Sequence, residues 1–200
     1  MKAIIEQSLL KSITYTEYRN RVTTLFAEGK VTGNEQSEAL LHYTELNETR
    51  MNRLEKTIKI SEDIAAKLEY LNRDYIWLLI SEGWCGDSAQ IVPVIHKMAE
   101  LSTHIDLRIV FRDENEVLMN LFLTNGTKSV PKLIVLDKNT LEVLGDFGPR
   151  PQGAIQLILD YKAQHGVVDE KGKSELHLWY FHDKGLSIQQ EIMDLMLSLE

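Results

Sequence analysis

The sequence predicts an α/β domain that has a helical segment before it and a helical extension after it. From Asp74 onwards, apolar runs of strand length alternate with runs whose apolar residues recur at helical spacing. Outside that region, the clearest patterns before it and after Gly166 are helical. We therefore divide the chain into residues 1–56, 57–166 and 167–200, of which the last ends in an amphipathic helix.

The first segment carries the start and stop signals of two helices. Thr14 followed by Glu17 is a capping-box pattern, and the apolar residues after it share one helix face. Gly29 is expected to end that helix. Asn34 is expected to cap a second helix that runs to about Leu54.

The middle of the chain alternates between strands and helices. Alternation over 57–60 indicates a short strand, and Ser61 is expected to cap the helix that follows it. The apolar run Tyr75–Ser81 is typical of a buried strand. The next run, Ser88–Leu101, predicts a helix that Pro93 kinks, because proline removes one backbone donor.

A second strand, a short helix and a hairpin follow. The run Ile105–Phe111 predicts the strand, and Asp113 resembles the cap of the short helix. The runs Lys132–Asp137 and Leu141–Phe147 flank a polar turn and predict a hairpin. Pro151 suits the first turn of another helix, since its missing N–H would be unpaired there.

The tail begins after Gly166, which is expected to end the preceding helix. Periodicity over 175–181 fits a strand or a helix, and both remain open. Ser187 with Gln190 forms a second capping-box pattern before a clear apolar stripe. The stripe predicts a helix that is packed on the core or on a second subunit.

Composition narrows the classes of function. A net charge of −8 and a pI near 5.3 argue against non-specific nucleic-acid binding. No apolar run approaches the ~20 residues needed to cross a bilayer, and Met1–Lys11 lacks the features of a secretory signal. The single cysteine cannot form an intrachain disulfide, which fits a reducing cytoplasm. We expect a cytoplasmic protein without nucleic-acid or membrane partners.

The chemistry of the chain centres on the stretch Trp84-Cys85-Gly86-Asp87-Ser88. Cys85 comes where a buried strand turns into a helix. The first N–H groups of a helix lack intrahelical partners and carry partial positive charge. A thiolate there is stabilised, so the sequence predicts a lowered pKa for Cys85.

The order of the elements and motifs over 57–166 resembles the thioredoxin family. The Trp-Cys-Gly start of the motif is similar, and Pro93 matches the proline that kinks the active-site helix of the family. Pro131, preceded by Val130, matches the family's cis-proline, and Gly145 or Gly148 corresponds to the glycine after its hairpin. The resemblance implies a thioredoxin-like fold with a central mixed sheet flanked by helices.

The chain departs from the family pattern at three positions. Ser88 stands where the family has its second cysteine, and Asp87 stands where it usually has proline. Leu79 replaces the buried aspartate that assists proton transfer in thioredoxins. The resemblance therefore implies a monothiol variant of the redox motif, and it excludes a self-sufficient dithiol reductase.

The surviving chemistry assigns catalytic roles to Cys85 and Ser88. A Cys85 thiolate can attack a disulfide and form a mixed disulfide, and the Ser88 hydroxyl can donate a hydrogen bond to that thiolate. Asp87 repels a second negative charge, so we expect a less acidic thiol than in a dithiol thioredoxin. Release then requires a small thiol such as glutathione, or a thiol on a client protein.

Five further residues are expected to seat the partner. Trp84 would cover the motif, and Gly86 and Asp87 flank the thiol. In the family the backbone before the cis-proline pairs with bound peptide, which by analogy assigns Val130 and Pro131 that role.

Two hypotheses remain open at the level of sequence. In the first, the chain performs thiol–disulfide exchange through Cys85, with no cofactor other than a small thiol as co-substrate. In the second, it is a catalytically silent thioredoxin-fold protein that acts as a protein-binding or assembly module. No metal site is expected, and His177 and His182 are interpreted as surface residues.

Overall fold

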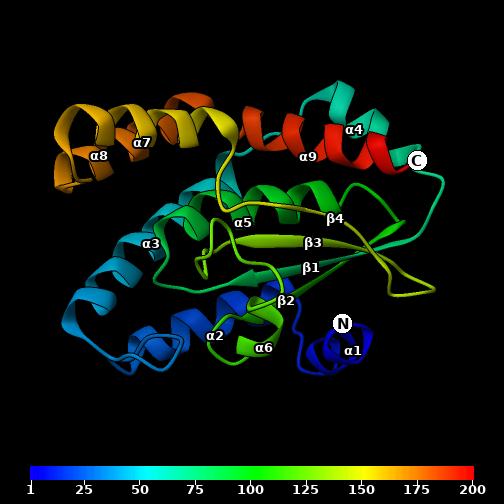
Figure 1. Ribbon diagram of the computed structural model, residues 1–200, viewed down its shortest axis with the longest axis horizontal. Coiled ribbons are helices and arrows are strands. Elements are labelled where there is room, and N and C mark those ends of the chain that lie inside the picture. The colour runs from blue at the N-terminus through cyan, green and yellow to red at the C-terminus, as the bar shows by residue number, and fades with distance from the viewer.

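One sheet of four strands forms the centre of the molecule, and the computed structural model describes every residue from 1 to 200 (Figure 1). The strands lie in the order β2-β1-β3-β4. Strands β1 and β2 are parallel, whereas β1 with β3 and β3 with β4 are antiparallel. This confirms the mixed sheet that the resemblance implied. The bounds are Tyr75–Ser81 for β1, Ile105–Phe111 for β2, Lys132–Asp137 for β3 and Val143–Phe147 for β4.

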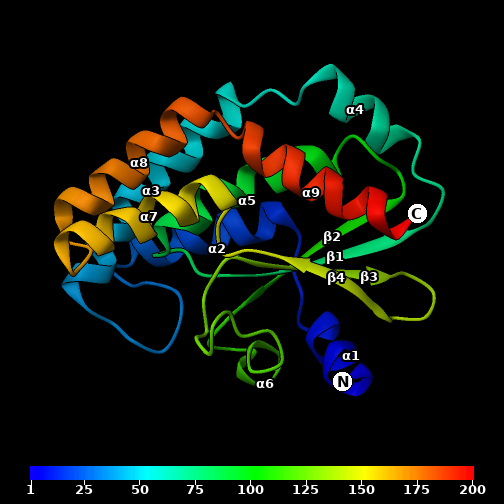
Figure 2. The same cartoon turned by 45° about the horizontal axis from the view of Figure 1, so that its top comes forward.

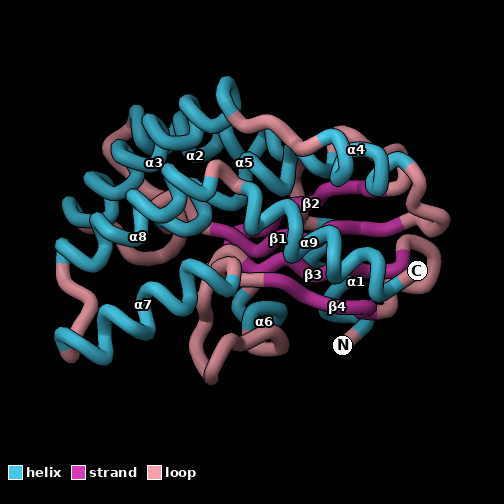
Figure 3. Tube along the Cα trace, turned by 90° about the horizontal axis from the view of Figure 1, so that it is seen from above, coloured by secondary structure: helices cyan, strands magenta, loops and turns pink.

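Helices cover both faces of the sheet. Figure 1 shows α1 and α6 below the sheet and α4, α5 and α9 above it. Helices α7 and α8 form a pair beside α3, as Figures 2 and 3 show. No helix has both the length and the apolar character that crossing a bilayer requires. The helices are α1 (Lys2–Leu10), α2 (Tyr15–Ala27), α3 (Glu38–Thr57), α4 (Glu62–Glu69), α5 (Gly86–Ala99), α6 (Glu116–Met119), α7 (Gln152–His165), α8 (Glu170–Asp183) and α9 (Leu186–Leu199).

The alternation of side chains along β1 divides the core in two. Trp77 and Leu79 belong to the larger apolar cluster, which also contains the inner face of α5. Leu78 and Ile80 point to the opposite face and pack with residues of α1 and α6. The larger cluster draws residues from α2, α3 and α9 as well, so the N-terminal segment and the tail share a core with the sheet.

The apolar runs in the middle of the chain locate the sheet strands well. Strands β1, β2 and β3 have the bounds that the sequence predicts, and β4 begins two residues later than expected, at Val143. The alternation over 57–60 is not a strand, because α3 extends to Thr57 and no neighbouring strand pairs with the residues after it. Instead, the Gln189 side chain accepts a hydrogen bond from the Ser61 N–H and donates one to the Lys59 carbonyl.

Three of the predicted caps are wrong, and each of those residues has another partner. Ser37 rather than Asn34 caps α3. The Asp113 carboxylate accepts a hydrogen bond from the Asn34 N–H instead of capping α6, whose N-cap residue is Asn115. Ser187 makes no capping box, because its hydroxyl donates to Asp183 and α9 begins after Gly185.

Other signals in the terminal segments are confirmed. The capping box of Thr14 and Glu17 begins α2, and Gly29 follows its end with a positive φ of 72°. Gly166 ends α7 with a φ of 79°. The undecided stretch 175–181 is part of α8, whose buried residues Leu176 and Tyr180 are one helical turn apart.

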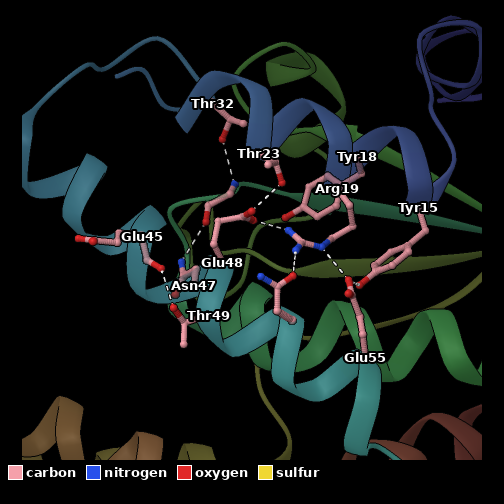
Figure 4. Close-up of polar contacts among 12 residues, drawn as sticks. Tyr15, Tyr18, Arg19, Thr23, Thr32, Glu45, Asn47, Glu48, Thr49 and Glu55 are labelled. Atoms are coloured by element: carbon pink, nitrogen blue, oxygen red, sulfur yellow. Dashed lines mark hydrogen bonds and ion pairs between the residues drawn. The ribbon is translucent and has the colours of Figure 1, made fainter. Parts of the chain in front are cut away.

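A polar network fixes α2 against α3. Arg19 of α2 donates to Glu48 and Glu55 of α3, and Thr23 donates to Glu48 at 2.6 Å (Figure 4). Arg19 is only 11% exposed, so these carboxylates compensate most of the cost of burying its charge. The network fixes the part of α3 that also carries Asn47, whose side chain reaches the Gly83 carbonyl just before the Cys85 motif.

Candidate functional site

Cys85 lies where β1 has ended and α5 begins, as the sequence predicts. It is the N-cap residue of α5, with an extended backbone, and its side chain makes no capping hydrogen bond. Its thiol instead donates to the carbonyl oxygen of Val130, at an Sγ–O distance of 3.2 Å. The peptide bond between Val130 and Pro131 is cis. The structure thus brings Cys85, Val130 and Pro131 together.

Burial and charge favour the neutral thiol. Burial raises the pKa of Cys85 to about 11, and the negative charge of Asp87 acts in the same direction. Backbone N–H groups at the start of α5 lower it, as expected for a helix N-terminus, but they do not offset the burial. The lowered pKa expected from position alone is therefore not what this environment produces.

Ser88 lies beneath Cys85 on the first turn of α5. Its residue is 0% exposed, and its hydroxyl finds no hydrogen-bond partner of normal geometry. The hydroxyl is still near enough to the sulfur to lower the pKa of Cys85, although less than burial raises it. The expected contact between Ser88 and the thiol is thus too weak to make the thiolate the resting form.

Asp87 is held by two residues from the C-terminal part of the chain. Both Nε and Nη2 of Arg150 contact its Oδ2, at 2.8 and 2.7 Å. The hydroxyl of Tyr180, from α8, donates to Oδ1 at 2.9 Å. We call this set of three residues the Asp87 clamp. Asp87 has only 11% of its side chain exposed, so its carboxylate is occupied and is not free to meet a partner.

The clamp shifts the acidities of its other members. Burial alone would lower the pKa of Arg150, but the hydrogen bond to Asp87 and the attraction to its charge together outweigh burial, and the pKa is raised. Burial raises the pKa of Tyr180, and the charge of Asp87 raises it further. The clamp therefore consists of a carboxylate, a guanidinium and a neutral phenol at physiological pH.

His177 is not the surface residue that the sequence suggests. Its ring lies against the motif, because a Cβ atom built on Gly86 would be 3.2 Å from His177 Cε1. Burial lowers the pKa of His177 to about 4, and Arg50 of α3 adds to the shift. His182, by contrast, is exposed, as expected. Gly86 thus faces a neutral imidazole from α8 rather than open solvent.

The N-terminal segment contacts the motif from the other side. The Asn47 side chain donates to the Gly83 carbonyl at 2.9 Å, and the Gly83 N–H donates to Thr32 at the same distance. The Trp84 indole N–H donates to the Thr32 carbonyl at 3.1 Å, and Cζ of Arg112 lies 4.8 Å from the centroid of the Trp84 ring. Trp84 is therefore fixed by its own chain.

Sequence reasoning missed these neighbours of the motif. Arg150 and Tyr180 lie 63 and 93 residues from Asp87 along the chain, and no local pattern connects them. Asn47 reaches across 36 residues in the same way.

No group of three or more His, Cys, Asp or Glu side chains is placed to hold a metal ion.

Comparison with known proteins decides the family. A family sequence model described as Thioredoxin matches residues 33–164. The chain belongs to the thioredoxin family. The match begins within the N-terminal segment, so it includes α3, which contacts the motif of this thioredoxin-family chain.

Two solved structures share the fold of this thioredoxin-family protein. An HIV epitope scaffold is 18% identical with a TM-score of 0.57, and the alignment covers 94% of this chain and 100% of the scaffold. A protein of unknown function from Pseudomonas aeruginosa is 20% identical with a TM-score of 0.50, covering 90% of this chain and 99% of that protein. At these identities the likeness shows the fold alone. The comparison with curated proteins gave no match.

Proposed function

We propose that this thioredoxin-family chain is catalytically silent at rest and acts as a binding module. The carrying observation is that the Cys85 thiol donates to the Val130 carbonyl in surroundings that raise its pKa to about 11. At pH 7 a thiol of that pKa is ionised in roughly one molecule in ten thousand, whereas a free cysteine is ionised in a few per cent.

The neighbours of the thiol support the same conclusion. The chain has no second cysteine to resolve a mixed disulfide, and Leu79 occupies the position of the family's proton acceptor. Val130 is 6% exposed, and its carbonyl already accepts the hydrogen bond from Cys85. A peptide that paired there would have to displace that bond. The chain therefore keeps the thioredoxin fold without the family's redox residues, and the same fold can serve binding functions.

Slow monothiol exchange is the second candidate, and the partial exposure of Cys85 favours it. In that reaction the Cys85 thiolate attacks a disulfide, one sulfur–sulfur bond forms as another breaks, and the partner's second sulfur leaves as a thiolate. A small thiol such as glutathione then has to attack the mixed disulfide and regenerate Cys85. The candidate requires the thiolate, which burial and Asp87 disfavour.

Reaction with glutathione disulfide at pH 7 separates the two candidates. The folded chain and the same chain unfolded in urea are incubated with it, and the Cys85 adduct is followed by mass spectrometry. The lower thiolate fraction of the folded chain is partly offset by its higher nucleophilicity, so we expect its adduct to form about 20-fold more slowly. An adduct that forms faster on the folded chain than on the unfolded chain would establish exchange and refute the silent assignment.

A further inference from the structure

A hollow of about 530 Å³ lies where the ends of three helices meet, away from the Cys85 thiol. The C-terminal ends of α3 and α8 and the N-terminal end of α9 form its walls. Its volume falls within the range of small-molecule sites, roughly 300–1,000 Å³. No residue of the Cys85 motif lines it, and the nearest link is Tyr180, whose hydroxyl belongs to the Asp87 clamp.

The lining of the hollow is largely apolar. Leu54 and Ile58 contribute from α3 and its end, and the Tyr180 ring contributes from α8. Phe181 and Leu186 complete the apolar surface and remain 53% and 55% exposed. Large apolar side chains that stay exposed around a concave surface are typical of a binding site.

All charged residues that line the hollow are cationic. They are Arg53, Lys59 and Lys184, and no carboxylate lines it, although the chain carries a net charge of −8. The Arg53 guanidinium carbon lies 5.4 Å from the centroid of the Phe181 ring. Arg53 forms no ion pair with a carboxylate, so its N–H groups are available to an anion in the hollow. Asp183, next to Lys184 in the sequence, does not line the hollow, and its carboxylate accepts hydrogen bonds from the N–H and hydroxyl of Ser187 at the start of α9.

Lys184 adopts a backbone conformation that is unfavourable for lysine. It has a φ of 55° and a ψ of 24°, the left-handed conformation in which glycine or asparagine is favoured at a helix end. Its N–H donates to the Tyr180 carbonyl and closes the last turn of α8. A lysine at this position supplies a cation at some cost in stability.

We propose that this hollow binds a small amphipathic anion, a carboxylate on a medium-length aliphatic chain. The chain lies on the apolar lining, and the carboxylate meets Arg53 and Lys184 at the rim. This inference goes beyond the silent-fold assignment and does not depend on it, since Cys85 takes no part. The volume suits a small molecule, and the exclusively cationic charged lining selects an anion over a neutral or cationic lipid-like compound.

Isothermal titration calorimetry with decanoate, below its critical micelle concentration, tests the proposal. We expect one decanoate per chain, with decan-1-ol and decyltrimethylammonium binding at least ten-fold more weakly. The variants Arg53→Gln and Lys184→Gly should each weaken decanoate binding by about five-fold. Lys138→Gln, which removes an exposed lysine from the β3–β4 turn, and Cys85→Ala should leave it unchanged.

Lys184→Gly also separates binding from folding. Glycine relieves the left-handed backbone, so this variant should unfold at the same or a higher temperature while it binds decanoate more weakly. Equal binding of decanoate and decan-1-ol, or undiminished binding by both cation variants, would overturn the proposal. So would a concentration-dependent dimer that buries Phe181 and Leu186 and excludes decanoate, because a second copy would then be the occupant.

Discussion

The hydroxyl of Tyr180 donates a 2.9 Å hydrogen bond to the Asp87 carboxylate across 93 residues of chain. This contact places the C-terminal extension over the first turn of α5, beside the only thiol of the protein. Arg150 completes the arrangement from the loop before α7. The extension is therefore a structural part of the candidate site, and it keeps the carboxylate that raises the pKa of Cys85 in place.

Breaking the Asp87 clamp should destabilise the fold. Arg150→Gln leaves the nearly buried Asp87 carboxylate without its cation, and we expect a loss of about 2–3 kcal/mol in the free energy of unfolding. Adding Asp87→Asn should recover part of that loss, since no unpaired charge then remains. Urea denaturation measures both. Arg108→Gln, which removes a more exposed pair with Asp106, is the control and should cost less than about 1 kcal/mol.

The contradicting outcome for the clamp is additivity. Asp87→Asn alone is measured as well. If the double variant lost the sum of the losses of Arg150→Gln and Asp87→Asn, the two residues would not be coupled.

Glu82 should make stability depend on pH. Burial raises the pKa of this fully buried carboxyl to about 7, and the charge of Asp113 adds to the shift. The folded chain then binds a proton between about pH 4.5 and 7 that the unfolded chain has released, so stability falls as pH rises through that window. The cost is full above about pH 7 and amounts to roughly 3 kcal/mol.

The variant Glu82→Gln isolates this contribution from those of other groups. The stability advantage of this variant over wild type should be larger at pH 8 than at pH 5, by roughly 2.5 kcal/mol, because a small part of the cost is already present at pH 5. Asp113 has a lowered pKa and acts in the opposite sense, but it titrates below both of the pH values compared. A difference between them that does not change with pH would show that Glu82 is not the titrating group.

Gly148 should tolerate no side chain. Its φ is 118°, and a Cβ atom there would lie 2.3 Å from the carbonyl oxygen of Pro131. Gly148→Ala should therefore lower the free energy of unfolding by more than about 2 kcal/mol, because backbone atoms have to move. Gly126→Ala is the matched control, since Gly126 also has a positive φ but nothing lies within 4 Å. Thermal unfolding of the two variants compares them, and equal losses would refute the contact with Pro131.

Local patterns predicted the parts of the site that the chain builds locally. Tyr75–Ser81 is almost entirely apolar because both of its faces are buried in the core, and Cys85 follows it at the turn into α5. The state of the thiol was beyond such patterns, because it depends first on how far the folded chain buries Cys85 and only then on Asp87, whose partners come from distant segments. Helix α8 was ambiguous for another reason, since Leu176 and Tyr180 are buried in the core whereas the apolar Leu178 and Phe181 are exposed, so the apolar residues do not mark one face.

The pH profile of Cys85 alkylation by iodoacetamide tests the central claim most directly. A partly buried thiol that lies beside Asp87 and donates to Val130 should give an apparent pKa near 11 in the folded chain. The urea-unfolded chain should give the ordinary value of about 8.5. A folded-state pKa at or below about 8.5 would contradict the account, because the resting protein would then hold a reactive thiolate.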